Sequence, residues 1–539
     1  METTTQFHDL SPRRARPSRE TWVALLSGLV ITAGLPPYSG TGALVPLAMA
    51  LLFWALLGTD KPARTAWFFG LTHQASTLYW LFLLDPSKSI PSPALVPIQA
   101  LVAIGYVSLF YLLLGWVHGR LRSRLGTARS LLMLPVLWVA MEALRSRGEL
   151  GFAWCLSGSS VIGGPLLSLA RASGEIGVGA GLAFVAALGA ALLVRRRGAS
   201  EQVVDARAVT MLAAGTAAVW IFLFLGAQAE PASPASHAQL ADSLGYQGKA
   251  VPVAAIQADV ALADKWNKAR LDATKIPYRE LSAQAGREGA ELIVWAETSV
   301  PAYVRYDADL LAWLRETVIE SGAWLLAGFP DADRSPEGEV RTYNSSGLFD
   351  PRGAQRDRYA KHHLLPIGES MPFQSWLPFL AGVNVGQAEW TPGPPPEPMN
   401  IGLKNGGFRI SGLICFESAF GQLARDSVRR GSQCLVVITN DGWFGKSAGP
   451  RQHAWLARLR AVECGVPVIR CANNGISFIA DAEGNILDSL DLGQRGVVRA
   501  EIVPGQGRTL FVKLGAWPLL VWSVLWLLMA AVAPVERRK

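Results

Sequence analysis

The sequence has few charged side chains for its length and lacks the residue patterns of a metal site. Of its 539 residues, 17% are charged and 50% are hydrophobic, whereas soluble globular proteins carry roughly 25% charged residues. Its five cysteines include no CxxC pair, and its seven histidines form no HExxH motif, which argues against a zinc site. We therefore expect part of the chain to lie in lipid, and we expect neither a metal nor a cofactor.

The chain also lacks a basic helix with interleaved aromatic residues, so its net charge of +8 does not indicate a nucleic-acid partner. The basic residues instead cluster at the ends and in short turns between apolar runs. They are Arg13, Arg14, Arg16, Arg19, Lys61, Arg64, Arg120, Arg122, Arg124, Arg195, Arg196, Arg197, Arg537, Arg538 and Lys539. This is the positive-inside pattern of a protein that crosses a membrane several times.

Eight apolar runs predict eight transmembrane helices. They cover about residues 22–38, 42–57, 63–84, 94–117, 129–147, 173–194, 207–227 and 514–533. Most reach the roughly 20 residues that span the hydrocarbon core, although the run at 42–57 is marginal. Charge alternation places both termini in the cytoplasm and residues between helices seven and eight outside it. Arg145 and Arg147 lie on the outer side against this rule, in a segment (145–172) that is either re-entrant or interfacial.

Between the seventh and eighth runs the composition changes to that of an α/β domain. Short apolar strands, as at 251–257 and 434–440, alternate with amphipathic patterns, as at 307–321 and 449–464. Strands of continuous apolar character predict a sheet covered on both faces. We divide the chain into a basic cytoplasmic tail (1–20), transmembrane helices one to seven (21–227), a Pro/Ala/Ser linker (228–247), the α/β domain (248–505), transmembrane helix eight (514–533) and a cytoplasmic tail (534–539).

Three segments of the α/β domain carry reactive side chains at strand ends or in a loop. Glu297 ends a strand in WAETSVP, Lys361 and Glu369 lie in YAKHHLLPIGESMP, and Cys415 stands where the strand FRISGLIC turns into a helix whose N–H groups favour a thiolate. A carboxylate base, a thiol and a fixed cation suit acyl transfer. Each residue alone has an ordinary structural interpretation, and spacing does not show that the three meet.

Taken together, the motifs resemble those of the nitrilase, or carbon–nitrogen hydrolase, superfamily. The motifs are WAETSVP, YAKHHLLPIGESMP, GLICFES, TNDGWFG and GPRQHAWLARLRAVECGVPVIRCANNG. A nitrilase-like domain inserted before the last helix of a membrane protein, with KxHLxPxGE and NDxWFG, is similar to the apolipoprotein N-acyltransferase family over essentially the whole chain. The resemblance implies a helical membrane domain of about eight spans and an α-β-β-α sandwich.

The resemblance also implies roles for individual residues. Cys415 would be the nucleophile, Glu297 the general base and Lys361 the oxyanion and orientation partner. The supporting or substrate-binding residues would be Glu369, Phe416, Glu417, Trp266, Asn344 and Trp443. The family usually has Tyr after the nucleophile, so Phe416 lacks a hydroxyl and any hydrogen bond it would make. Asn344 could equally form a turn, and Trp443 could equally be a packed aromatic residue.

The implied reaction transfers an acyl chain from a membrane phospholipid, through a cysteine thioester, to the α-amino group of a diacylglyceryl-cysteine lipoprotein. The implied location is the bacterial inner membrane, with the catalytic domain on the periplasmic side. A membrane-tethered amidase and a non-catalytic membrane scaffold remain as alternatives. The loop at 372–400, rich in proline and apolar residues, would either dip into the lipid interface or serve as an ordinary lid.

Overall fold

The structure is a computed structural model that describes most of the chain. The described residues are 18–38, 40–84, 93–196, 204–230, 249–265, 268–334, 338–373, 376, 389–403 and 406–533. The tail at 534–539, most of the linker predicted at 228–247, and much of the 372–400 loop lie outside them.

One half of the molecule is a bundle of helices. Its members are α1 (Arg19–Ala33), α2 (Leu44–Gly58), α3 (Pro62–Thr77), α4 (Leu95–Leu125), α5 (Thr127–Arg145), α6 (Ala170–Arg196), α7 (Ala206–Gln228) and α15 (Trp517–Val532). Each of the predicted apolar runs is therefore helical. Four helices of the described chain, α4 to α7, are long and apolar enough to cross a membrane, while α2 and α15 are shorter apolar helices. The count of eight crossings stays a prediction.

The outer surface of the bundle is apolar. Large hydrophobic side chains are exposed on several helices, among them Trp22, Leu26, Leu101, Trp116, Ile221, Leu225 and Leu528. An apolar surface this extensive is not stable in water and marks contact with lipid. The helical half is thus a membrane domain.

The other half is a sandwich of two sheets, each six-stranded within the described chain. In order along the first sheet lie β12 (Gly496–Ile502), β1 (Val251–Gln257), β2 (Leu292–Trp295), β3 (Trp324–Arg334), β4 (Val340–Phe349) and β5 (Gln355–Ala360). The second contains β11 (Ile486–Leu490), β10 (Ser477–Ala480), β9 (Val468–Ala472), β8 (Cys434–Thr439), β7 (Phe408–Ile414) and β6 (Met399–Ile401). Val253, Leu326, Ile410, Val436 and Ile469 meet between the sheets in a shared core.

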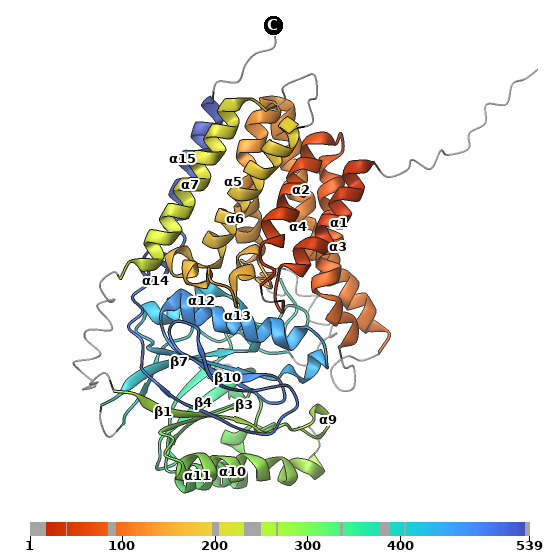
Figure 1. Cartoon of the computed structure of the whole chain (residues 1–539). Coiled ribbons are helices and arrows are strands. Elements are labelled where there is room, and N and C mark those ends of the chain that lie inside the picture. Colours follow the sequence, from red (N-terminus) through yellow and green to blue (C-terminus); the bar gives the residue numbers. More distant parts are fainter. Residues whose placement is uncertain are drawn as a thin grey trace, which may run out of the picture.

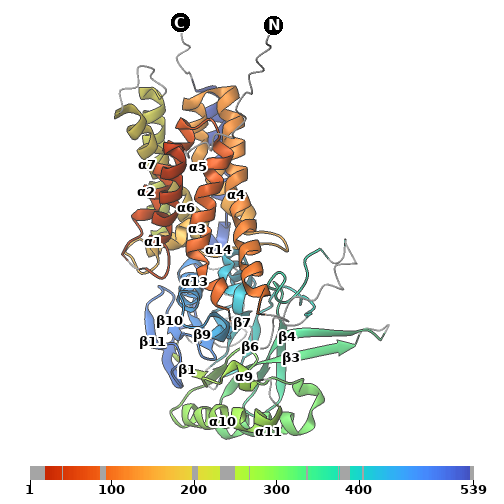
Figure 2. The ribbon, with the colours of Figure 1, turned by 90° about the vertical axis from the view of Figure 1, so that its right-hand side faces the viewer.

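Helices cover the outer faces of both sheets. The first sheet packs on α10 (Leu271–Arg287) and α11 (Ala308–Ser321), and the second packs on α12 (Gly421–Arg429) and α13 (Gly449–Cys464). This is the predicted α-β-β-α sandwich. In Figures 1 and 2, α12 and α13 lie between the second sheet and the membrane helices, so one layer of the sandwich faces the bundle.

The segment at 145–172 joins the two halves. It contains the short 3-10 helices η2 (Ser157–Val161) and η3 (Leu167–Leu169), and most of its side chains after Gly151 are buried. Glu142 of α5 accepts hydrogen bonds from the backbone N–H and the hydroxyl of Ser157. The segment is therefore packed inside the protein, at the junction of the membrane domain and the sandwich.

Gly158 of η2 gives a test of this packing. A Cβ atom there would overlap the backbone carbonyl of Glu175 in α6, whereas a Cβ atom on Gly105 of α4 would meet nothing within 4 Å. We predict that Gly158→Ala lowers the free energy of unfolding by about 2 kcal/mol, a common effect of overpacking. Gly105→Ala, as the control, leaves it unchanged or slightly higher. Thermal unfolding in detergent measures both, and equal stabilities would contradict the packing described.

Candidate active site

The reactive side chains lie where neighbouring strands end. β1, β2 and β3 are parallel to one another, as are β7, β8 and β9. Glu297 follows β2, Cys415 follows β7 and Asn440 follows β8. Since the carboxyl ends of parallel strands share one edge of a sheet, the two sheets bring these residues together. Lys361 reaches the same place at the end of β5.

Cys415 occupies a sharp corner. Its backbone has a φ of 53°, a strained value for a residue other than glycine, and it begins the 3-10 helix η7 (Cys415–Ala419). Burial raises the pKa of the thiol above its ordinary value, and Glu297 adds to this, although Lys361 acts in the opposite direction. The desolvation of this half-buried thiol therefore opposes the thiolate that a following helix was expected to favour.

Glu297, Lys361, Glu369 and Asn344 form one buried cluster. The Lys361 ammonium is 2.8 Å from the nearer Glu369 oxygen and 3.9 Å from Glu297. The Asn344 amide donates to Glu297 at 2.8 Å and to Glu369 at 3.2 Å. The second oxygen of Glu297 accepts from the backbone N–H of Asn440 at 3.0 Å. Each carboxylate is thus held by several donors, which fixes its orientation.

Burial and ion pairing shift the pKa values of Glu297 and Lys361 for different reasons. Burial raises the pKa of the Glu297 carboxyl above its ordinary value, and Lys361 only partly offsets this effect. Burial alone would lower the pKa of Lys361, but Glu369 and Glu297 outweigh it and hold that pKa above its usual range. The site therefore has a permanent cation beside a carboxylate that accepts protons more readily than a free glutamate.

Glu417 does not line the pocket but joins the loop that carries Lys361 to the corner at Cys415. One oxygen accepts from the Tyr359 hydroxyl and from the backbone N–H groups of His362 and His363, at 2.7 to 2.9 Å. The other accepts from the Ile414 N–H at 2.7 Å. The side chain is fully buried. A carboxylate two residues after the cysteine therefore joins the end of β7 to the loop that carries Lys361.

The pocket above Cys415 is apolar, with a volume of about 170 Å³. Glu297, Lys361 and Cys415 lie among aromatic walls contributed by both domains. The walls are Phe416, Trp443 and Phe444 from the sandwich, and Trp80, Phe152 and Trp154 from the membrane domain. Phe416 stacks on Trp154 with ring centroids 6.5 Å apart and an interplanar angle of 19°.

Several residues of the site were not predicted from the sequence. His453 bonds the Cys415 carbonyl through Nε2 at 2.9 Å and Asp441 through Nδ1 at 3.0 Å. Asp441 in turn pairs with Arg470 at 2.8 Å. All three are fully buried. Asp441, His453 and Arg470 belong to the quoted motifs TNDGWFG, GPRQHAW and VPVIRCA, so the motifs contained the signal, but only the fold shows the contact with the nucleophile turn.

Gln452 ties the pocket wall to the membrane domain. Its carbonyl oxygen accepts from the indole N–H groups of Trp80 and Trp154, at 2.9 and 2.8 Å. Its amide donates to the backbone carbonyls of Pro36 and Thr77, both at 3.2 Å. A single buried side chain therefore orients both tryptophans. Of the predicted site residues, Trp266 alone lies outside the described residues.

Residues 252–510 match the carbon–nitrogen hydrolase family model. An amidase from Nesterenkonia sp. is a similar solved structure, with 20% identity, a TM-score of 0.38, and coverage of 51% of this chain and 97% of that one. The sandwich, with a cysteine, a glutamate and a lysine at one pocket, places the α/β half in the carbon–nitrogen hydrolase class.

The rest of the chain narrows this class. Residues 27–188 match the model of the apolipoprotein N-acyltransferase N-terminal domain. Proteins named apolipoprotein N-acyltransferase are similar over almost the whole length: one from Pseudomonas aeruginosa at 30% identity, covering 97% of this chain and 99% of its own, and one from Azotobacter vinelandii at 32%, covering 94% and 95%. The chain belongs to the apolipoprotein N-acyltransferase family, and it is a membrane-bound acyltransferase.

The tie through Gln452 can be tested by an isosteric substitution. Gln452→Met keeps the volume but leaves two indole N–H groups and two carbonyls without partners, and each such loss costs about 1–3 kcal/mol. We predict a marked fall in the melting temperature and a higher KM for the acyl donor. Gln284→Met, at a half-buried glutamine whose side chain bonds only Glu288 in the described chain, is the control. A Gln452→Met protein with normal KM and stability would contradict this function of the amide.

Proposed function

We propose that this chain takes an acyl chain from a membrane phospholipid and transfers it to the α-amino group of the N-terminal diacylglyceryl-cysteine of a lipoprotein. Cys415 is the nucleophile, Glu297 the general base and Lys361 the cation that stabilises the oxyanion. The observation that supports this most directly is the pocket itself: a neutral thiol beside a buried carboxylate and an ammonium, under apolar walls that come partly from the membrane domain.

In the first step the Glu297 carboxylate takes the Cys415 proton as the sulfur attacks the ester carbonyl of the phospholipid. The S–C bond forms, and the carbonyl oxygen becomes an oxyanion next to Lys361. The ester C–O bond then breaks, and the leaving alkoxide receives the proton from Glu297. The products are a thioester on Cys415 and a lysophospholipid. The raised pKa of Glu297 suits it to both proton transfers.

In the second step the amine nitrogen of the lipoprotein attacks the thioester. Glu297 accepts an amine proton as the N–C bond forms, and the C–S bond breaks. The departing sulfur takes the proton back from Glu297, so the enzyme returns to its resting state. Asn344 and Glu369 keep Glu297 and Lys361 in place, while Glu417 fixes the Lys361 loop. Phe416 and Trp443 line the path of the acyl chain.

The membrane domain would admit the lipid substrates. Trp80, Phe152 and Trp154 extend from the bundle into the pocket, so an acyl chain can pass from the bilayer to Cys415 without crossing water. An aromatic wall from the membrane domain would serve no purpose in an amidase that acts on small soluble amides. The buried Glu297 and Lys361 would serve no purpose in a non-catalytic scaffold. Trp266 and the loop at 372–400 would contribute further contacts to substrate.

We also propose that the sandwich lies on the periplasmic side of the bacterial inner membrane. The basic turns at Lys61–Arg64 and Arg120–Arg129 lie at the ends of helices α2 to α5 that point away from the sheets (Figure 1). Basic residues flank the cytoplasmic ends of membrane helices. The sheets would then face the opposite compartment.

The first prediction concerns the thioester. The purified protein mixed with phospholipid vesicles should gain one acyl-sized mass that hydroxylamine removes, because a thioester is cleaved by this nucleophile. Intact mass spectrometry should show no such adduct on Cys415→Ala. Cys464→Ala, at a fully buried cysteine far from the pocket lining, is the matched control and should keep it. Ammonia release from simple amides without an adduct would favour an amidase instead.

The second prediction concerns pH. Because the ionised form of Glu297 is the base and its pKa is raised, acyl transfer should fall as the pH drops through a value above the ordinary glutamate pKa of about 4.3. Glu297→Gln should lose about 10²–10⁴ in kcat/KM and the acid limb with it. The pH profile of kcat/KM measures both. Retention of the acid limb in Glu297→Gln would exclude Glu297 as the base.

A further inference from the structure

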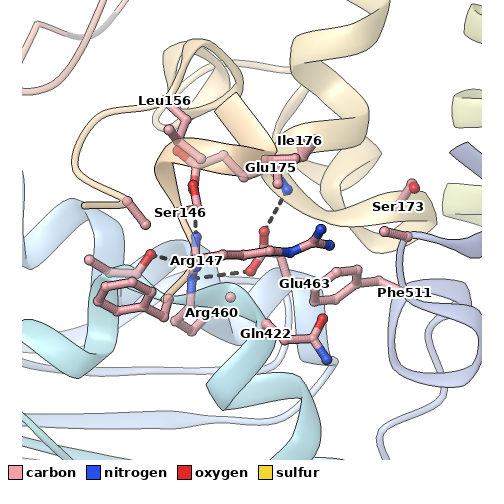
Figure 3. A pocket seen from close by; sticks show the side chains of 16 residues that line it. Ser146, Arg147, Leu156, Ser173, Glu175, Ile176, Gln422, Arg460, Glu463 and Phe511 are labelled. Carbon is pink, nitrogen blue, oxygen red and sulfur yellow. Dashed lines mark hydrogen bonds and ion pairs between the residues drawn. The ribbon is translucent and has the colours of Figure 1, made fainter. Parts of the chain in front are cut away.

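A second cavity lies on the far side of the nucleophile turn from the active site. Its volume is about 150 Å³, and it is enclosed by the end of α5, the start of α6, residues 419–422 and α13. Figure 3 shows its polar side chains, with Ser146, Arg147 and Glu175 from the membrane domain and Gln422, Arg460 and Glu463 from the sandwich. None of its lining residues also lines the pocket above Cys415.

Two buried carboxylates in this cavity depend on the same cation. Glu175 and Glu463 share one guanidinium, that of Arg460, at 3.0 and 3.1 Å. The Oε1 atom of Glu175 has no hydrogen-bond partner among the described residues, although the side chain is only 4% exposed. A buried carboxylate oxygen without a partner is costly. This oxygen therefore has room for one further hydrogen-bond donor, such as an ammonium group.

At the mouth of the cavity stands Arg147, one of the two arginines that break the positive-inside pattern. Its side chain is exposed and makes no hydrogen bond or ion pair within the described part of the chain. A free guanidinium at the level where the membrane domain meets the sandwich is suited to a phosphate group. The cavity thus offers a site for an anion at its mouth and a site for a cation inside.

An apolar slot adjoins this cavity within the bundle. It has a volume of about 210 Å³ and lies between α6, α7 and α15, where Ala218, Phe222, Leu519 and Trp522 line it. Ser173 lines both the slot and the polar cavity. The helix α6 departs from helical geometry at Ser173 and Gly174, and the Ser173 hydroxyl is buried without a hydrogen-bond partner in the described chain.

We propose that these two spaces form one site for a resident glycerophospholipid with a primary-amine headgroup, separate from the acyl-donor site. An acyl chain fills the slot between α6, α7 and α15. The Ser173 hydroxyl donates to an ester carbonyl, the phosphate binds Arg147, and the ammonium group binds Glu175. The lipid ties the kinked α6 to residues 419–422, which directly follow the turn that carries Cys415.

The slot is tested by filling it. Native mass spectrometry of the delipidated full-length chain, titrated with dioleoyl phosphatidylethanolamine in detergent, should show one high-affinity lipid fewer for Ala218→Phe than for its parent. Both carry Cys415→Ala, so that no acyl transfer occurs. Ala217→Phe is the control, because Ala217 is exposed on the same helix and does not line the slot. Equal numbers of tightly bound lipids in Ala218→Phe and its parent would refute the site.

The headgroup is tested by comparing two lipids at this site. The parent should bind phosphatidylethanolamine about tenfold more tightly than phosphatidylglycerol, the effect of one charge-assisted hydrogen bond. Glu175→Gln should remove this preference. Arg147→Gln should weaken the binding of both lipids, whereas Arg207→Gln, at the opposite end of the bundle, should weaken the binding of neither. Equal affinity of the parent for the two lipids would overturn the assignment of an amine. Melting temperatures identify any variant that has lost its fold. If a headgroup variant is unfolded, the Ala218→Phe measurement decides whether the lipid site exists.

Discussion

The structure of the site depends on a charge that has been removed from water. Lys361 is 2% exposed. Burying an unpaired cation in this way would cost several kcal/mol of lost hydration free energy. Glu369 and Glu297 compensate for that loss, and Asn344 bonds both of them. The same two carboxylates would repel each other without the lysine. The cluster is stable only as a whole, which is why it can hold a carboxylate and a cation in fixed positions beside the Cys415 thiol.

This constraint accounts for much of the surrounding structure. Lys361 must keep one orientation at the end of β5. One oxygen of Glu417 accepts three hydrogen bonds from the 359–363 segment and so fixes that orientation, while its other oxygen accepts from the end of β7. His453, bonded to the Cys415 carbonyl and backed by Asp441 and Arg470, fixes the opposite side of the nucleophile turn. The strained φ of Cys415 persists because both sides are held.

The sequence predicted the parts of this arrangement that depend on local pattern. β1 begins and ends where the apolar run VPVAAIQ does, and α13 covers the predicted 449–464. Strands β4, β5, β6, β10, β11 and β12 were not among the predicted strands. QRDRYA of β5 is rich in charge and lies at the edge of its sheet, whereas β6 and β10 contain only three and four residues. Contacts between distant segments, such as Gln452 with Trp80 and Trp154, leave no local pattern at all. The desolvation that opposes a thiolate at Cys415 is likewise a property of the fold and not of the local sequence.

The aromatic wall shows why the membrane domain is more than an anchor. Trp154 lies just before η2, which packs against α6, and it stacks on Phe416, the residue after Cys415. In that apolar setting a phenol hydroxyl would need a partner, and a phenylalanine needs none. The Phe416 ring therefore contributes area and stacking to the pocket without needing a hydrogen-bond partner. The pocket wall and the nucleophile turn are thus one packed unit across the two domains, and a change in the bundle at Trp80 or Trp154 acts directly on the space above Cys415.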